Sequence, residues 1–535
     1  MNKFQNFLIY ILSGLILGFA FPPNNIFLLG FIGFVPILYK FYINEDHKIK
    51  LRYIYLTFFL YHSISNWWIG SWQKDTDPYL TASAIALAVI HPFFFFIPFY
   101  FLNKFAKILN KKYSLLLFPF IWVAFEWLHS LGEASYPWLT IGYTQINNYY
   151  WIQFIDITGI WGASLLILFI NVLIVLIISN LNLKFHIKEF LSQNKFYFIY
   201  ILLIVFIPLV YSFFSINYWK NDKIYDGELE IGIIQPSINP WRKWDTSVDK
   251  QIDLHFKLQD SLYKSNPEIS LFVWSETSIP AHINYEDKYQ LYRFQKWVDE
   301  HNCSMLAGFA EIQFYNKDNA TPTARIFNND SNLFYESYNS VFIVNPNEIN
   351  NGHYRKMKLT PFAERIPYVE YILFMRKWLE WGVGISSWGL GKKQNILTLY
   401  NKNRNIKFAP IICIESIYPK FVSNFSILEA EFFVIITNDS WYDYTPGPRQ
   451  HYIIAQARAI ENRKYIVRCA NSGISGVISV TGQSIKEIPQ YEVTAESFKI
   501  KLSNHKTIYS IFGDWLPILS VISLFIIYLI KYFRK

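Results

Sequence analysis

The chain has 535 residues, of which 52% are hydrophobic, 19% aromatic and 17% charged, and its net charge is +9. This length allows two or three domains. Three cysteines do not indicate a disulfide framework, although a Cys303–Cys469 pair stays open, and the sequence has no metal-ligand spacing, phosphate-binding loop or internal repeat.

Apolar blocks about as long as a bilayer is thick fill the first 220 residues and return near the C-terminus. Candidate membrane spans are 7–21, 25–43, 53–71, 80–102, 113–130, 158–180, 197–216 and 514–531. Because no small-residue cleavage site follows the first block, we interpret it as a retained span rather than a signal peptide. The sequence therefore predicts a membrane domain of seven helices over 1–220 and an eighth helix with a short tail over 512–535.

Lysine and arginine are concentrated in alternate connections between these spans. The basic groups are Lys40, Lys48, Lys50 and Arg52; Lys104, Lys107, Lys111 and Lys112; Lys184, Lys188 and Lys195; and Lys531, Arg534 and Lys535. The connections 72–79 and 131–157 carry a single basic residue, Lys74. The positive-inside rule then predicts cytoplasmic termini and places residues 226–503 on the opposite side of the membrane. The basic excess indicates topology, and we expect no nucleic acid partner.

Residues 226–503 have the pattern of a water-exposed α/β domain. Strands are predicted at 228–235, 270–276, 304–311, 339–346, 407–415, 432–438, 465–471 and 475–482. Several are continuous apolar runs, as in strands that helices cover. A helix is predicted over 448–464, beginning at Pro448, with Ile453, Ala457 and Ile460 on one face. Together these patterns predict a layered α/β fold.

Polar side chains gather where these strands end, where α/β folds usually build their sites. They are Glu276, Asn339, Cys413, Glu415, Asn438, Asp439 and Asn471. Asparagine, aspartate and glutamate also suit turns for structural reasons alone, so position by itself leaves both interpretations open.

Glu276, Lys356 and Cys413 would together suffice for acyl transfer through a thioester. A carboxylate can take the proton of a thiol, and an ammonium can stabilise the oxyanion that develops. Cysteine is also among the residues most often buried, so Cys413 could be a structural thiol. Spacing along the chain does not show that the three side chains meet.

Three segments place these residues in a recognisable order: "LFVWSETSIP" (271–280), "YRKMKLTPFAERIP" (354–367) and "IICIESIYP" (411–419). Through these three segments, residues 226–503 resemble the nitrilase, or carbon–nitrogen hydrolase, superfamily. The chain as a whole resembles the apolipoprotein N-acyltransferase family, also through "FEWLHSLGEASYPWLTIGYTQ" (125–145), "IIQPSINPWRKWD" (233–245) and residues 437–476. The resemblance implies a four-layer αββα domain joined to a polytopic membrane domain of about eight transmembrane helices.

The resemblance also implies roles for individual residues. Glu276 would be the general base, Lys356 the oxyanion stabiliser and Cys413 the nucleophile. Supporting roles would go to Glu364, Glu415 and Asn339, and substrate handling to Trp138 and Trp244. Tryptophan is enriched at membrane interfaces regardless of function. The alternative for both residues is therefore an interface position without a role in substrate handling.

Glu126 lies inside a predicted span, where a carboxylate is costly and should face protein or water. It would be either part of a lipid entry site or a structural contact at a helix end.

Three positions depart from the family pattern. Ile414 replaces the usual tyrosine after the cysteine, Ala363 a usual glycine, and Ser275 a usual proline. None of these changes removes a reacting group.

The implied activity is transfer of a fatty acyl chain from a membrane phospholipid to the α-amine of an N-terminal diacylglyceryl-cysteine on an apolipoprotein. We expect no cofactor and no metal. We expect the protein to be a membrane-embedded monomer. One alternative is a membrane-tethered nitrilase-type amidase that releases the acyl group to water. Another is a transporter or receptor, which would need paired or broken helices with charges in mid-span. Glu126 and His62 are ionisable residues inside predicted spans, and a position near the membrane interface stays open for both. The glycine-rich segment 381–393 is a candidate lid.

Overall fold

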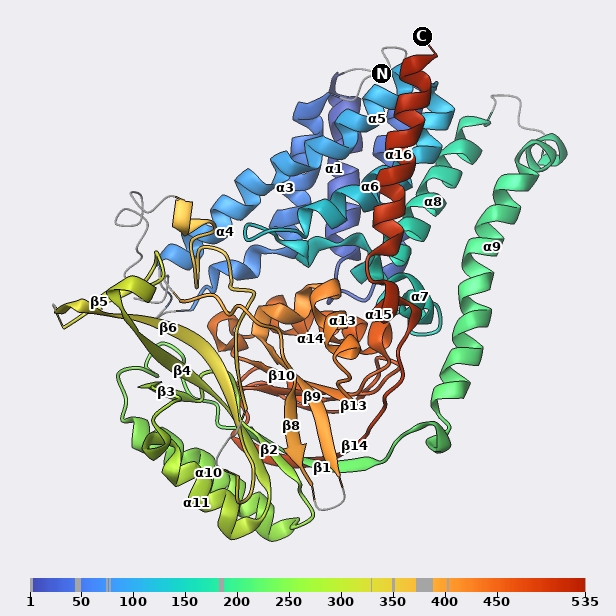
Figure 1. Ribbon diagram of the computed structural model, residues 1–535. Coiled ribbons are helices and arrows are strands. Elements are labelled where there is room, and N and C mark those ends of the chain that lie inside the picture. The colour runs from blue at the N-terminus through green and yellow to red at the C-terminus, as the bar shows by residue number, and fades with distance from the viewer. Residues whose placement is uncertain are drawn as a thin grey trace.

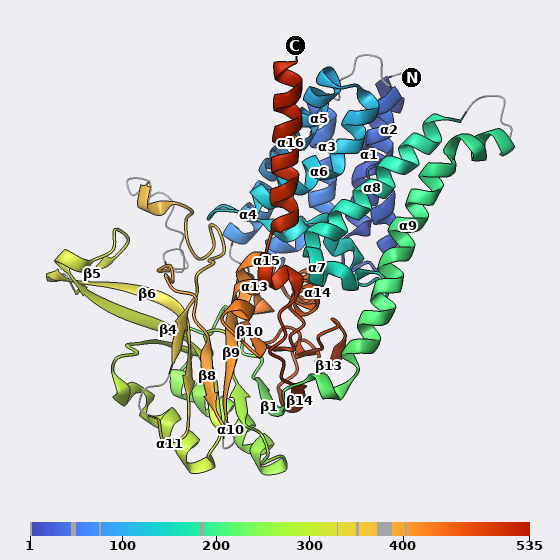
Figure 2. The same ribbon diagram turned by 45° about the vertical axis from the view of Figure 1, so that its right-hand side comes forward.

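Figure 1 shows the computed structural model, which describes residues 3–43, 50–73, 76, 78–181, 187–328, 330–348, 352–371, 388–401 and 404–534. A bundle of helices stands on a domain of two sheets, and the chain returns from the sheets to the bundle in its last helix. Both chain ends lie at the end of the bundle farthest from the sheets (Figures 1 and 2). The candidate lid falls largely on residues 381–387, outside the described ranges.

The helical part contains long apolar helices joined by short 3₁₀ segments. Its elements are α1 (Lys3–Ala20), η1 (Phe27–Phe31), α2 (Val35–Ile43), α3 (Leu51–Ser65), η2 (Trp67–Gly70), α4 (Pro78–Ile90), η3 (His91–Phe95), α5 (Phe96–Ile108), α6 (Lys111–His129), η4 (Pro137–Leu139), η5 (Ile141–Gln145), η6 (Ile152–Phe154), α7 (Ile155–Thr158), α8 (Ile160–Ser179), α9 (Ile187–Trp219), α15 (Ile508–Phe512) and α16 (Trp515–Phe533).

Among the described residues, four helical stretches are long and apolar enough to cross a membrane: Leu80–Ile108, Ile160–Ser179, Ile187–Trp219 and Trp515–Phe533. Large apolar side chains such as Phe206, Phe213 and Phe525 are exposed on α9 and α16, as on helices that lipid surrounds. The protein thus has the helices of a membrane protein, while the count of eight spans stays a prediction.

The predicted span 25–43 is not one continuous helix. It is divided into η1 and α2, and the buried side chain of Asn171 on α8 lies at the break. Asn171 Oδ1 accepts from Phe34 N at 2.9 Å, and its Nδ2 donates to Gly30 O at 3.0 Å. One amide therefore satisfies backbone groups that the interruption frees in an apolar environment.

The other part of the chain forms two sheets. One has the order β14-β1-β2-β4-β6-β5, with β3 paired to β4 and β7 to β6, and the other has the order β13-β12-β11-β10-β9-β8. The strands are β1 (Glu228–Gln235), β2 (Leu271–Val273), β3 (Ile279–Ile283), β4 (Ser304–Asn316), β5 (Arg325–Phe327), β6 (Asp330–Val344), β7 (His353–Arg355), β8 (Leu397–Tyr400), β9 (Asn405–Ile412), β10 (Phe432–Thr437), β11 (Ile466–Ala470), β12 (Ser475–Ile478), β13 (Ser484–Ile488) and β14 (Thr494–Lys501).

The sheets face each other and helices cover their outer faces, which confirms the αββα layering. Cys469 Sγ on β11 lies 3.3 Å from the carbonyl oxygens of Ile234 on β1 and Val273 on β2, so the sheets are in direct contact. Helices α10 (Val248–Ser265) and α11 (Tyr292–His301) cover the first sheet. Helices α13 (Pro419–Ile427) and α14 (Pro446–Asn462) lie between the second sheet and the bundle (Figure 1).

Each predicted strand is present; the strand predicted at 228–235 has the bounds of β1, and the others differ at one or both ends. The helix predicted to begin at Pro448 begins two residues earlier, because Pro446 occupies the first helical turn after the N-cap residue Thr445. Ile453, Ala457 and Ile460 are buried as predicted.

The side chain of Gln450 on α14 joins the two parts of the molecule. Its Oε1 accepts from the indole nitrogens of Trp68 and Trp138 at 3.0 and 2.8 Å. Its Nε2 donates to the carbonyls of Pro22 and Ser65 at 2.8 and 3.0 Å. A single buried amide thus links three separate membrane-domain segments to the sheet domain.

Candidate active site

Cys413 lies at the end of the apolar strand β9, where the chain turns into a short 3₁₀ helix, Cys413–Ile417. Its φ is +52°, a conformation that costs free energy for a residue with a Cβ. The turn is held from both sides: Glu415 Oε2 accepts from Ile412 N, and Ser416 Oγ donates to Cys413 O, both at 2.8 Å. The thiol is partly exposed and stands on a strained, well-braced strand end.

Lys356 follows β7 and is 1% exposed. Its Nζ lies 3.0 Å from Glu276 Oε1 and 2.8 Å from Glu364 Oε1. Burial disfavours the ammonium, but the two carboxylates outweigh burial, and the pKa of Lys356 is well above its ordinary value. The lysine is therefore a permanent positive charge between two acids.

Asn339 on β6 holds the same two acids. Its Nδ2 donates to Glu276 Oε1 at 2.7 Å and to Glu364 Oε1 at 3.1 Å. The backbone carbonyl of Asn339 accepts from Lys356 N at 2.8 Å, because β7 pairs with β6. The predicted residues Glu276, Lys356, Glu364 and Asn339 thus form one buried network.

Cys413 lies within electrostatic range of this network. Burial raises the pKa of the Cys413 thiol above its ordinary value; Glu276, Asp439 and Glu364 raise it further, and Lys356 lowers it. Cys413 is therefore a neutral thiol at rest and needs a base to become a nucleophile.

Glu415 joins the cysteine turn to the lysine loop. Its Oε1 accepts from Tyr354 OH and Met357 N, both at 2.7 Å. Burial raises the pKa of Glu415 to about 7, against the opposing effect of these hydrogen bonds. The side chain holds the turn of Cys413 and the loop of Lys356 in fixed positions relative to each other.

The residues expected to handle substrate are not brought together. Trp138 is 4% exposed and bonded to Gln450, whereas Trp244 is 40% exposed beside His282. Glu126 is buried, and its Oε1 accepts from Trp122 Nε1 at 2.9 Å and Ile141 N at 2.8 Å. The contacts of Glu126 hold α6 to η5, which is a structural role.

Lys243, which the sequence reasoning missed, lies against the general-base candidate. It is 2% exposed, and its Nζ donates to Glu276 O at 3.3 Å and to Thr277 Oγ1 at 3.4 Å. Burial lowers the pKa of Lys243 to about 8, although Glu276 raises it in part. Its place in "WRKWD", beside Trp244, was the available signal.

A second cluster, of which the sequence analysis named only Asp439, lies behind the cysteine turn. Asp439 contacts Arg468 Nη2 at 2.7 Å and His451 Nδ1 at 3.0 Å, and His451 Nε2 lies 2.8 Å from Ser416 Oγ. Burial favours the neutral acid, but Arg468 and His451 outweigh burial and hold the pKa of Asp439 well below its usual range. The cluster braces the turn on which Cys413 stands.

Ile414, where the family pattern has tyrosine, is buried in the core. A different phenol lies within electrostatic range of the thiol: burial raises the pKa of Tyr442, and the charge of Cys413 raises it further.

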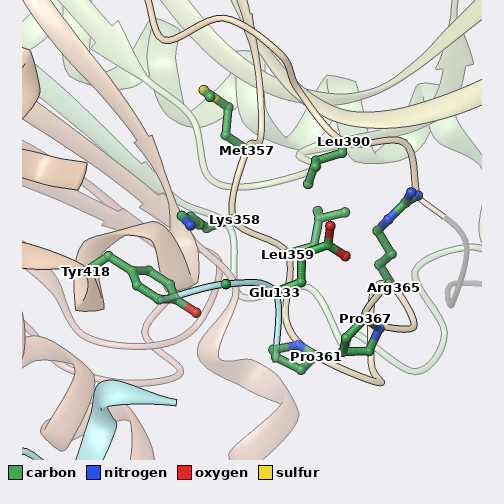
Figure 3. A pocket seen from close by; sticks show the side chains of 10 residues that line it. Glu133, Met357, Lys358, Leu359, Pro361, Arg365, Pro367, Leu390 and Tyr418 are labelled. Carbon is green, nitrogen blue, oxygen red and sulfur yellow. The ribbon is translucent and has the colours of Figure 1, made fainter. Parts of the chain in front are cut away.

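A pocket opens beside this site, where the turn after α6 meets the loop that carries Lys356. It holds about 430 Å³ of space, part of it open to solvent. Figure 3 shows Lys358 and Tyr418 on one side and Arg365 on the other. The lining residues are Gly132, Glu133, Met357, Lys358, Leu359, Pro361, Arg365, Pro367, Leu390 and Tyr418.

Residues 230–498 match the sequence pattern of the family described as "Carbon-nitrogen hydrolase". The chain belongs to this family. Residues 13–173 match a second pattern, "Apolipoprotein N-acyltransferase N-terminal domain". Both families are the ones expected from the motifs.

The similar proteins span nearly the whole chain. A protein of Chlorobaculum tepidum named apolipoprotein N-acyltransferase is 29% identical, covering 96% of this chain and 93% of its own length. One of the same name from Rickettsia prowazekii is 27% identical, covering 97% of each. Among solved structures, Saccharomyces cerevisiae Nit3, titled a member of branch 10 of the nitrilase superfamily, is 15% identical with a TM-score of 0.36, covering 55% of this chain and 96% of its own.

Proposed function

We propose that this protein is an apolipoprotein N-acyltransferase that uses Glu276, Lys356 and Cys413. The observation that carries the proposal is a thiol beside a buried carboxylate–ammonium network, in a sheet domain mounted on apolar helices. The full-length relatives, which carry this name, support the same activity.

In the first half-reaction, Glu276 takes the thiol proton and Cys413 Sγ attacks the acyl ester of a membrane phospholipid. The carbonyl π electrons move to oxygen, and the ammonium of Lys356 stabilises that oxyanion. When the intermediate collapses, the ester C–O bond breaks, Glu276 returns its proton to the leaving oxygen, and the lysophospholipid departs.

In the second half-reaction, the α-amine of a diacylglyceryl-cysteine attacks the thioester. Glu276 takes a proton from the attacking nitrogen, the C–S bond breaks, Glu276 gives the proton to the Cys413 sulfur, and the acyl chain remains on nitrogen as an amide. The donor ester supplies the activation, so the mechanism needs no coenzyme.

Supporting residues keep the carboxylates in place during these steps. Asn339 and Lys356 hold Glu276 and Glu364 together, and Thr360 donates to Glu364 Oε2 through N and Oγ1, both at 2.8 Å. In this proposal, Glu364 balances the charge of Lys356 and fixes its position.

The proposed setting is a bacterial inner membrane, with a helical domain over 1–220, a periplasmic catalytic domain over 226–503 and a final helix over 512–535, acting as a monomer. The position of both chain ends at the far end of the bundle supports this orientation (Figure 2). We propose lipid handling for Trp244, which has an exposed indole and follows Lys243, a contact of Glu276. The contacts of Trp138 and Glu126 favour a structural role in the membrane domain for these two residues.

A membrane-tethered amidase is the competing function, and it would share Cys413 and its network. A transporter is disfavoured because His62, one turn before Ser65 on α3, lies near the contact with Gln450 rather than at mid-span.

The test is intact-mass measurement of the purified enzyme after incubation with phospholipid. We expect wild type to gain one acyl mass and Cys413→Ala to gain none. An amidase would lose the adduct to water as fast without an acceptor peptide as with one. Activity retained in Cys413→Ala would overturn the mechanism.

A further inference from the structure

The pocket of Figure 3 lies between the membrane domain and the catalytic loop, and we call it the Lys358 pocket. Gly132 and Glu133 come from the turn after α6, and Met357 and Lys358 directly follow Lys356. A lipid ester placed at Lys356 would have its polar part within reach of this pocket. The pocket belongs to neither domain alone.

Two of its three charged side chains are already engaged. Arg365 is 4% exposed; its Nη1 donates to Trp388 O at 3.0 Å, and its Nη2 pairs with Glu370. Glu133 Oε2 accepts from Tyr368 N at 2.8 Å. These contacts fix the walls of the pocket.

The ammonium of Lys358 has no such partner. It lies 5.1 Å from the centre of the Tyr418 ring, and within the described part of the chain its Nζ has no hydrogen-bond acceptor or carboxylate partner. Burial lowers the pKa of Lys358, and the carboxylates of Glu415 and Glu133 raise it only in part. A half-buried ammonium with unused donors favours binding of an anion.

The rest of the lining limits the kind of anion. Met357, Leu359, Pro361, Pro367 and Leu390 make most of the wall apolar. An anion attached to a hydrocarbon-bearing molecule fits such a wall better than a small hydrated ion does, since the apolar surface is then covered as well.

We propose that the Lys358 pocket binds the phosphodiester of the glycerophospholipid donor, with Lys358 as its cation. This rests on the proposed function, because it assigns a place to the charged part of that donor. Lys356 then acts at the ester and Lys358 at the phosphate of the same lipid molecule.

The test compares the rate of Cys413 acylation from a phospholipid with that from a diacylglycerol of the same acyl chains, in the full-length enzyme. We expect Lys358→Gln to lower the phospholipid-to-diacylglycerol ratio about tenfold to a hundredfold, the loss of one charge-assisted hydrogen bond. Lys358→Arg should keep the ratio, and Lys257→Gln, on the exposed face of α10, should not change it.

An unchanged ratio in Lys358→Gln would overturn the proposal. If the ratio is unchanged because both rates fall by the same factor, Lys358 acts through Lys356 instead. Sodium phosphate added with diacylglycerol should not raise its rate; a rise would assign the pocket to free phosphate. Absence of any acyl adduct on wild type would instead refute the proposed function.

Discussion

Two carboxylates, Glu276 and Glu364, face one ammonium, Lys356, in the buried network beside Cys413. Lys243 supplies a second buried ammonium against Glu276, which balances the negative charge. Moving the thiol proton to Glu276 then shifts charge within a neutral group instead of creating a net buried charge. Lys243 also holds the turn at Thr277, whose φ is +44°.

We therefore expect Lys243→Met to slow Cys413 acylation at least about tenfold, through lost positioning and charge balance. The wild-type rate should fall as pH rises through about 8, because the ammonium of Lys243 loses its proton there. Stopped incubations analysed by mass across pH 6 to 10 would measure both effects.

Lys250→Met is the matched control. Lys250 is exposed in the first turn of α10, a few residues after Lys243, and its replacement should leave the pH profile of the rate unchanged. A decline near pH 8 that persists in Lys243→Met would exclude Lys243 as its cause.

At the scale of residues, the sequence analysis identified the candidate reacting residues but missed several residues that contact them. The structure brings together five residues that the motifs identified: Glu276, Lys356, Cys413, Glu364 and Asn339. Lys243, and the pairing of Asp439 with His451 and Arg468, became visible only through contacts between residues far apart in the chain.

At the scale of elements, the turn that carries Glu276 depends on strand β4. Gly308 on β4 lies directly under it: a Cβ there would come within 2.6 Å of Ser275 O and 2.7 Å of Thr277 N. Both contacts are with backbone, which cannot move without displacing Glu276. The glycine is required by this close approach rather than by its own backbone conformation.

Gly308→Ala should therefore reduce acylation by about a hundredfold while the fold is kept, because misplacement of a catalytic group by an ångström has effects of that size. Acylation kinetics and the unfolding temperature in detergent would be measured together. Asn316→Ala, at the exposed end of β4, serves as the control. Normal kinetics in Gly308→Ala would show that the turn adjusts.

Element prediction succeeded where a pattern is local and failed where a distant side chain intervenes. The sequence predicted eight strands that the structure contains, whereas the short or edge strands β3, β5, β7, β8, β13 and β14 were not predicted. The break within 25–43 depends on Asn171, more than a hundred residues away, which no local pattern contains.

At the scale of the whole molecule, the sheet domain lies at one end of the bundle and both chain ends at the other (Figures 1 and 2). Gln450 and the buried pair of Arg463 with Asp156 tie α14 and its following turn to the bundle. The catalytic domain is thus mounted on the helices rather than tethered by them.

This arrangement predicts protease accessibility in membrane vesicles. In inside-out vesicles, a tag after Lys535 should be removed while the catalytic domain stays intact, and in spheroplasts the reverse should hold. Digestion after detergent addition controls for resistance of the folded domain. Cleavage of the catalytic domain in intact inside-out vesicles would contradict the periplasmic assignment.

The sequence by itself determined the family, the apolar character of the helices and the chemistry available, since motifs, hydropathy and residue types are local properties. Only the tertiary structure decided which charges neutralise one another, how Cys413 is braced and where the Lys358 pocket opens. The physical reason is that burial and hydrogen bonding depend on neighbours in space, and at this site those neighbours come from both sheets and from the membrane domain.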